Sequence, residues 1–339
     1  MFRVGVDLGG TNIAAAVVDE QYHIISRASS ETGLPRSADS ICDEIAGNVS
    51  AAISAAGLTP AEITNYGIGS PGVVDVERGM VIRASNLDFT MVPLRRMLHE
   101  RTGQIFCCEN DANAAAYGEY IAGSGRGTRH FLALTLGTGI GGGIIINGKI
   151  YSGAGYAGGE LGHSVIVQDG EPCTCGRKGC FETYASASAL IRDGRRAMQQ
   201  NPDSLLWDFC RQNPDRLNAK LVFDAKAAGD QTADFVIRRY IAYLSTGIAN
   251  LIRTLQPEVL CIGGGISNQG QPLLDAIEEV LRTRDFAQNS TRVTLLKIAE
   301  LGNDAGLIGA AFLEPDFISA GSRRTPCSIY SVNRKKGFI

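Results

Sequence analysis

The chain carries the same short pattern twice: an apolar run, a glycine-rich turn and a second apolar run. The first copy spans residues 4–18, with its turn at 7–12, and the second spans residues 131–146, with its turn at 137–143. A tight glycine turn between two apolar runs is typical of a β-hairpin. Because each copy is followed by segments of alternating strand and helix character, the repeat predicts two similar α/β domains that face a cleft.

The expected domains follow from the positions of the two copies. The N-terminal α/β domain is expected at residues 1–122 and the C-terminal α/β domain at residues 123–314. The remaining segment, residues 315–339, lacks periodicity and mixes Gly, Ser and Pro with basic residues. We expect this segment to be a poorly ordered tail.

Apolar spacing predicts four helices. Ile41, Ile45, Val49 and Ile53 recur every four residues, and their segment stops at Gly57, which is typical of a helix with one buried stripe. The other helices are expected at residues 112–121, 233–255 and 304–313, and further strands at residues 24–26 and 259–262.

The composition favours a soluble globular protein with a small-molecule partner. Apolar residues make up 44% and charged residues 20%, and the formal net charge of -3 provides no basic field for nucleic acid or a membrane surface. The nine cysteines have irregular spacing, so we expect reduced thiols and a cytoplasmic location. No signal peptide is expected, since Asp7 interrupts the first apolar run, and the glycine-rich uncharged run at residues 131–148 is unsuited to a membrane helix.

Both glycine turns are suited to binding phosphate. In the first turn, an acid at the strand end precedes two glycines, a hydroxyl and an amide: Asp7, Gly9, Gly10, Thr11 and Asn12. Asp7 is placed to hold the Mg²⁺ of ATP, and the glycines let backbone amides approach a phosphate. Alone, such a turn is more often a plain hairpin. The second copy, at Gly137, Thr138 and Gly139, favours two phosphate loops.

Two other nucleotide-binding patterns are excluded by context. Gly137, Gly139 and Gly142 match the spacing G-x-G-x-x-G, but residues 144–146 continue as a strand and residues 147–148 are an Asn-Gly turn. A dinucleotide-binding fingerprint requires a helix at this point. The P-loop pattern G-x-x-x-x-G-K-[ST] does not occur in the sequence.

Asp111 is a candidate general base. It follows the apolar run 105–108 and precedes the alanine-rich helix 112–121, so it lies at a strand-to-helix junction where α/β proteins bind ligands. A carboxylate there is able to accept a proton from a substrate hydroxyl. On this segment alone, an ordinary N-cap at Asn110 or Asp111 is favoured over a general base.

One imidazole and three thiols form a candidate metal site: His163, Cys173, Cys175 and Cys180. Four such ligands complete a tetrahedral zinc site of the structural kind. The acids Glu160 and Glu182 flank these residues, and carboxylates beside an imidazole are suited to binding sugar hydroxyls. Chance clustering of thiols and isolated surface glutamates are the alternatives.

These residues together resemble the ROK family of sugar kinases and related repressors, from Val4 to about Leu313. The most specific part of the resemblance is the segment 173–182, which has the family's motif C-x-C-G-x-x-G-C-x-E at every fixed position. The resemblance implies an actin-like ATPase fold, a duplicated ribonuclease H-like unit with two domains around a cleft. It also implies ATP-dependent phosphorylation of a hexose, with Mg²⁺-ATP and a structural Zn²⁺.

The resemblance assigns roles to individual positions. Asp111 would be the general base, and Gly264 and Gly265 would border the adenosine, while the two glycine turns would hold the phosphates. His163 would use one ring nitrogen for zinc and the other for a sugar hydroxyl. The residues expected to hold the sugar are Asn86, Asn110, Asp111, Glu160, His163 and Glu182.

Several alternatives remain within this family, both other kinases and a non-enzymatic regulator. Residues 183–188 resemble the glucokinase branch, which favours glucose, but N-acylmannosamine, fructose or allose kinase activity is the alternative. A sugar-sensing repressor would carry a helix-turn-helix segment before the first glycine turn, whereas six residues precede Asp7, so we expect an enzyme and no nucleic-acid partner. By analogy with the family, we expect a dimer or tetramer.

Overall fold

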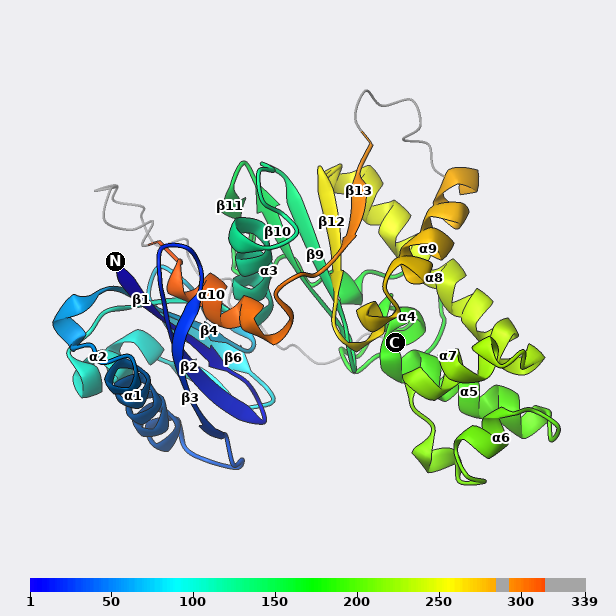
Figure 1. Ribbon diagram of the computed structural model, residues 1–339, viewed down its shortest axis with the longest axis horizontal. Helices are drawn as coiled ribbons and strands as arrows, with labels where there is room; N and C mark the ends of the chain where they lie inside the picture. Colours follow the sequence, from blue (N-terminus) through cyan, green and yellow to red (C-terminus); the bar gives the residue numbers. More distant parts are fainter. Residues whose placement is uncertain (285–292, 315–339) are drawn as a thin grey trace, which may run out of the picture.

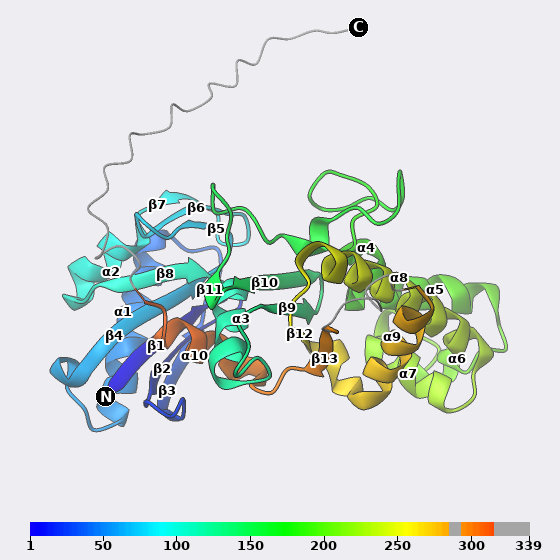
Figure 2. The same cartoon turned by 90° about the horizontal axis from the view of Figure 1, so that it is seen from above.

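The computed structural model describes residues 1–284 and 293–314, and its helices and strands form two halves, each built on a five-stranded sheet (Figure 1). The first sheet has the order β3-β2-β1-β4-β8, and a small three-stranded sheet, β5-β6-β7, lies beside β8 (Figure 2). The strands of this half are β1 (Phe2–Leu8), β2 (Asn12–Val18), β3 (Ile24–Glu31), β4 (Ile63–Ser70), β5 (Val73–Asp75), β6 (Met80–Ala84), β7 (Phe89–Val92) and β8 (Phe106–Asn110). Its helices are α1 (Ala38–Ala55) and α2 (Leu94–Thr102), with a short 3-10 turn, η1 (Pro60–Glu62).

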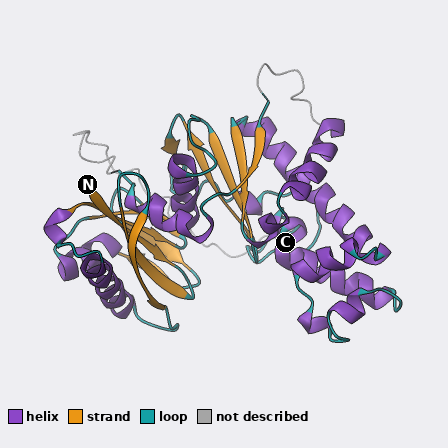
Figure 3. Ribbon diagram, viewed as in Figure 1, coloured by secondary structure: helices purple, strands orange, loops and turns teal. Residues whose placement is uncertain are grey.

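The second sheet has the order β11-β10-β9-β12-β13 and carries a larger helical layer (Figure 3). Its strands are β9 (Phe131–Leu136), β10 (Ile140–Ile146), β11 (Lys149–Ile150), β12 (Val259–Gly263) and β13 (Leu295–Ile298). Its helices are α4 (Glu182–Ala185), α5 (Ala187–Gln200), α6 (Leu206–Phe209), α7 (Ala219–Ala227), α8 (Gln231–Leu255) and α9 (Gln271–Arg284), with 3-10 turns η2 (Leu161–His163), η3 (Pro214–Arg216) and η4 (Gly265–Gln269).

The two sheets have corresponding topologies, which confirms the predicted α/β duplication. In each sheet, three consecutive strands pair antiparallel and the first of them then pairs in parallel with a later strand, β4 in one half and β12 in the other. Both predicted hairpins form, with Leu8 opposite Ile13 and Leu136 opposite Ile140. Asn147 and Gly148 have φ values of 53° and 79°, as a two-residue hairpin turn requires.

One predicted strand is longer than expected. The strand predicted at residues 24–26 runs as β3 to Glu31. Its inward positions beyond Ser26 are Ala28 and Ser30, which are small, and Ser30 accepts a hydrogen bond from Asn48 of α1. Because these side chains are not strongly apolar, the alternation of this strand was not visible in the sequence.

Two helices lie between the sheets: α3 (Asp111–Ala122) and α10 (Ala305–Ala311) (Figure 1). α10 follows the 3-10 turn η6 (Gly302–Asp304) and packs on α3, β1 and β4, although it comes last in the described chain. A Cβ atom added at Gly309 would lie 1.8 Å from the carbonyl oxygen of Ala114, so glycine permits this close helix crossing. The expected division at residue 122 stays a prediction.

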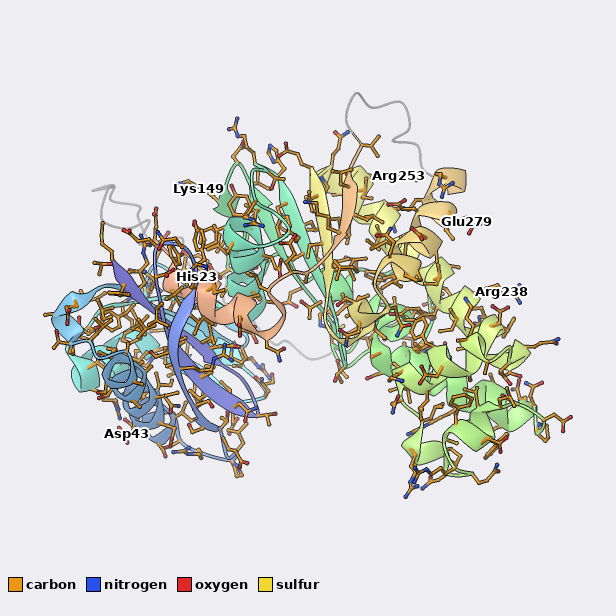
Figure 4. All side chains as sticks on the ribbon, in the orientation of Figure 1. His23, Asp43, Lys149, Arg238, Arg253 and Glu279 are labelled. Atoms are coloured by element: carbon orange, nitrogen blue, oxygen red, sulfur yellow. The ribbon has the colours of Figure 1, made fainter. Side chains whose placement is uncertain are left out.

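Each half has its own apolar core, centred on α1 in the first half and on α8 in the second. Charged side chains such as Asp43 on α1 and Arg238 on α8 lie at the outer surfaces (Figure 4). Within the described ranges, no helix is both long and apolar enough to span a bilayer. The predicted tail, residues 315–339, lies outside the described residues.

Candidate active site

A cleft of about 1610 Å³ opens between the two halves, and residues from both glycine turns line it. The predicted site residues among its walls are Asp7, Asn12, Asn86, Asp111, Gly137, Thr138, Gly139 and Glu182. These residues come from five separate segments of the chain, which the fold brings to one cavity. A large cleft with a few convergent polar groups is the usual place for a small-molecule site.

Asp7 and Asp111 lie at the same edge of the first sheet, near the ends of β1 and β8, which flank β4. In the strand register, Asp7 of β1 pairs with Gly69 of β4, and Gly69 pairs with Glu109 of β8, two residues before Asp111. Burial and the charge of Asp111 together raise the pKa of Asp7 from 3.8 to about 6. An electrostatic environment of this kind favours a bound cation, because a cation would compensate two carboxylates that repel each other.

The first glycine turn is closed by backbone hydrogen bonds. The Gly9 amide donates to the Asn12 carbonyl oxygen over 2.8 Å, and the Thr32 hydroxyl donates to the Gly9 carbonyl oxygen over 2.7 Å. Asn86 lies beside this turn, since a Cβ atom added at Gly10 would be 3.3 Å from its side-chain nitrogen. Asn86 therefore approaches the turn from the loop between β6 and β7.

Asp111 is the first residue of α3, and Asn110 is the N-cap. The Asn110 side-chain oxygen accepts from the Asn113 amide over 3.1 Å, and its side-chain nitrogen donates to the Gly72 carbonyl oxygen over 3.0 Å. Burial raises the pKa of Asp111, the nearby Glu160 carboxylate raises it further, and a hydrogen bond from the Ala112 amide opposes both. The carboxylate is therefore more basic than a free aspartate, which suits acceptance of a proton.

The second glycine turn lies against Glu182. The Gly137 amide donates to the Gly139 carbonyl oxygen over 3.0 Å, and the Ile140 amide donates to Glu182 Oε2 over 3.4 Å. The other carboxylate oxygen, Oε1, lies 3.4 Å from His163 Nδ1 and 3.1 Å from Cys173 Sγ. Glu182 thus lies between the second turn and the predicted metal ligands.

The predicted metal ligands form one cluster. The ligand atoms of His163, Cys173, Cys175 and Cys180 all lie within 4.8 Å of one another. Cys175 Sγ is 3.6 Å from Cys180 Sγ, and Cys173 Sγ is 3.5 Å from His163 Nδ1. Tetrahedral zinc, with Zn–S of about 2.3 Å and Zn–N of about 2.0 Å, needs edges of about 3.5–3.8 Å. The four residues therefore fit a structural zinc.

The three thiols differ in pKa, since burial raises the pKa of Cys173 to about 12 and also raises that of Cys180. Hydrogen bonding from the Arg177 amide lowers the pKa of Cys175 to about 6, and the thiolate is the form that binds a metal. Because His163 presents Nδ1 to the thiols, its Nε2 is the nitrogen left for another partner.

Several predicted ligand-binding residues are not among the residues that line the cleft: Gly9, Gly10, Thr11, Asn110, Glu160, His163, Gly264 and Gly265. Gly264 has a φ of 82°, and a Cβ atom added there would lie 2.5 Å from the Leu136 carbonyl oxygen, while Gly265 begins η4. Gly264 is thus required for close packing of β12 on β9, whether or not it contacts a nucleotide. The roles predicted for Gly264 and Gly265 at the adenosine stay predictions.

The sequence analysis missed several polar residues of the cleft. Arg27 and Ser29 of β3, Arg192 of α5 and Asn303 of η6 line it. Arg27 pairs with Asp304, and Arg192 donates to the Thr183 carbonyl oxygen over 2.8 Å. The sequence signal that could have identified Arg27 and Ser29 is the alternation of side chains between the two faces of a strand as long as β3. Residues i and i+2 of a strand share a face.

Two α/β halves with corresponding sheets, and a cleft lined by residues of both glycine turns, define the actin-like ATPase class. The chain belongs to the ROK family, whose sequence profile matches residues 3–316. It is 38% identical over 317 residues to a glucokinase of Streptomyces coelicolor, covering 92% of this chain and 98% of that protein. A glucokinase of Thermotoga maritima is 37% identical, with coverage of 91% and 95%.

A solved structure agrees with this assignment. The crystal structure of a ROK family glucokinase from Streptomyces griseus in complex with glucose and AMPPNP is 37% identical and superposes with a TM-score of 0.76. The match covers 92% of this chain and 98% of that chain. The predicted fold and family are therefore confirmed.

Proposed function

We propose that this protein is an ATP-dependent sugar kinase that phosphorylates glucose at its 6-hydroxyl. The observation that carries the proposal is that Asp111, Asp7 and Asn12 of the first glycine turn, and residues 137–139 of the second line one cleft. The glucokinases among its relatives, including one that binds glucose and AMPPNP, support the same substrates. The cleft has room for both a hexose and a nucleotide, since its volume is about 1610 Å³.

Asp111 is proposed to act as the general base. Its carboxylate accepts the proton of the 6-hydroxyl as that oxygen forms a bond to the γ-phosphorus of ATP. The bond between the γ-phosphorus and the β,γ-bridging oxygen breaks, and ADP leaves with that electron pair. The raised pKa of Asp111 favours proton uptake at the moment of transfer.

Mg²⁺-ATP is proposed to enter with its phosphates between the two turns. Asp7 faces the cation, and backbone amides of residues 10–12 and 138–139 face the phosphates. Arg192 and Asn303 add donors to the cleft. Because Asp7 and the turn amides are fixed by the two hairpins, they favour an in-line arrangement of the reacting groups without reorganisation.

The sugar is proposed to lie on the Asp111 side of the cleft, held by Asn86, Asn110, Glu160, His163 and Glu182. Glu160 is close enough to Asp111 to raise its pKa, which supports its place beside the same substrate. The zinc residues would hold the loop that carries His163 and precedes Glu182. Zinc there is structural, since all four positions are protein ligands.

The test is a coupled ADP-release assay on glucose, mannose, allose, fructose and N-acetylmannosamine. We expect the highest kcat/KM for glucose, because a site built from paired hydrogen-bonding groups rejects a sugar that leaves them unpaired. Another sugar with a higher kcat/KM would overturn the choice of glucose. Absence of sugar-dependent ADP release with every sugar would overturn the kinase proposal itself.

A further inference from the structure

A buried carboxylate outside the proposed chemistry lies where the two halves join. Glu119 is in α3, two turns after Asp111, and is only 3% exposed. A buried carboxylate is costly unless several donors satisfy it. The hydrogen-bond donors to Glu119 therefore indicate which segments of the chain it holds in place.

Glu119 accepts hydrogen bonds from both connections between the halves. One connection leads from α3 to β9, and in it the Ser124 amide donates to Oε2 over 3.0 Å. The other leads from β13 to α10, where the Glu300 amide donates to Oε2 over 3.2 Å and the Leu301 amide donates to Oε1 over 2.7 Å. One side chain thus ties together two segments that are far apart in the sequence.

The surrounding residues support this arrangement. A Cβ atom added at Gly123 would lie 2.2 Å from Glu119 Oε2, so glycine leaves room for the carboxylate. Lys297 Nζ, from strand β13, donates to the Ser124 carbonyl oxygen over 3.0 Å and makes a second tie to the connection between α3 and β9. All three groups facing the Glu119 carboxylate are N–H donors. Glutamine would direct its NH₂ group at a donor, so the site requires a carboxylate.

The segment after Leu301 belongs to the cleft. Gly302, Asn303, Gly306 and Leu307 line it. A Cβ atom added at Gly306 would lie 3.1 Å from Asp7 Oδ2, so this segment packs directly against the carboxylate proposed to face Mg²⁺-ATP. Movement of the Glu300–Leu301 backbone would therefore change the wall of the cleft at the nucleotide side.

We propose that Glu119 is a positioning residue that clamps the two connections and thereby holds residues 302–307 against Asp7 for Mg²⁺-ATP binding. The clamp itself follows from the hydrogen bonds, and its effect on the nucleotide rests on the proposed kinase function. The sugar contacts proposed above come from other segments. Loss of the clamp should consequently affect the nucleotide more than the sugar.

The test compares Glu119→Gln with Glu300→Gln in the full chain. Glu300 is a matched control because its exposed side chain pairs with Arg126 over 3.5 Å, whereas its backbone amide remains in both variants. For Glu119→Gln we expect hydrogen exchange at the Ser124, Glu300 and Leu301 amides to accelerate at least about tenfold, the scale of one lost charge-assisted hydrogen bond. We also expect KM for Mg²⁺-ATP to rise at least about fivefold, with KM for glucose nearly unchanged.

Unchanged exchange at these amides, or kinetics that match those of Glu300→Gln, would overturn the proposal. If Glu119→Gln does not fold, Lys297→Met is measured in its place, since it removes only the hydrogen bond from Lys297 to the Ser124 carbonyl oxygen. This variant should show the same changes at smaller size, and wild-type behaviour would overturn the proposal. A wild-type protein without sugar kinase activity would refute the proposed function, whereas the exchange comparison would still decide whether Glu119 clamps the connections.

Discussion

Replacement of Asp7 by Asn should make the protein more stable at neutral and basic pH. The pKa of Asp7 is raised from 3.8 to about 6 by burial and by Asp111. Between these two values the folded protein binds more protons than the unfolded chain, so its stability falls as pH rises through this window. At 1.36 kcal/mol per pKa unit, ionised Asp7 costs about 3 kcal/mol above pH 6. Neutral Asn removes that cost.

Urea unfolding of the nucleotide-free protein at pH 8 and pH 4 measures this effect. We expect Asp7→Asn to raise the free energy of unfolding by about 3 kcal/mol at pH 8 and by less than about 1 kcal/mol at pH 4, where wild-type Asp7 is mostly protonated when folded. Stabilisation by Mg²⁺-ATP should be lost in the same variant.

The control is Asp19→Asn, which should act in the opposite direction. Hydrogen bonds from His23 and Gln21 lower the pKa of Asp19, so its ionised form stabilises the folded state above its unfolded pKa and that stability is lost in acid. Asp19→Asn should therefore be less stable than wild type at pH 8. An Asp7→Asn variant equal to or less stable than wild type at pH 8 would refute the reasoning.

Three further changes test other parts of the structure. Cys175→Ser should lose the one zinc per chain expected in metal analysis and weaken glucose binding more than nucleotide binding, and active protein without zinc would contradict the structural role. Gly309→Ala should destabilise the fold by about 3 kcal/mol in urea unfolding, because its Cβ would lie 1.8 Å from the Ala114 carbonyl oxygen. The control is Gly47→Ala in α1, where an added Cβ atom would have no other atom within 4 Å. This variant should be neutral or stabilising, and equal changes in the free energy of unfolding for the two variants would reject the close-crossing argument. Truncation after Glu314 should leave activity intact, and insoluble or inactive protein would identify the tail as a packed or interface element.

The hairpins and the metal ligands could be predicted because their signals are local. A glycine turn between two apolar runs is contained in fewer than twenty residues, and so are the four zinc ligands. The position of Asp111 at the start of α3 was predictable for the same reason, since a strand, a polar junction and an alanine-rich helix follow one another directly.

The remaining features depend on contacts between distant segments. α10 returns to the first sheet, but nothing within its seven residues indicates which sheet it covers. Arg27 and Arg192 are cleft residues, yet in the sequence each is indistinguishable from a charge on a solvated face. Glu119 likewise resembles any glutamate of a helix until the connections that donate to it are placed in space.

The activity of Asp111→Asn tests the central claim most directly. Asn preserves the shape of the side chain and an oxygen that can accept from the Ala112 amide, as Asp111 Oδ1 does over 2.9 Å, but it has no carboxylate to take the sugar proton. Steady-state kinetics should show kcat lowered at least about a hundredfold, the usual scale for a lost general base, while calorimetry shows glucose still bound. Near-wild-type turnover in this variant would contradict the assignment of Asp111 as the general base of a sugar kinase.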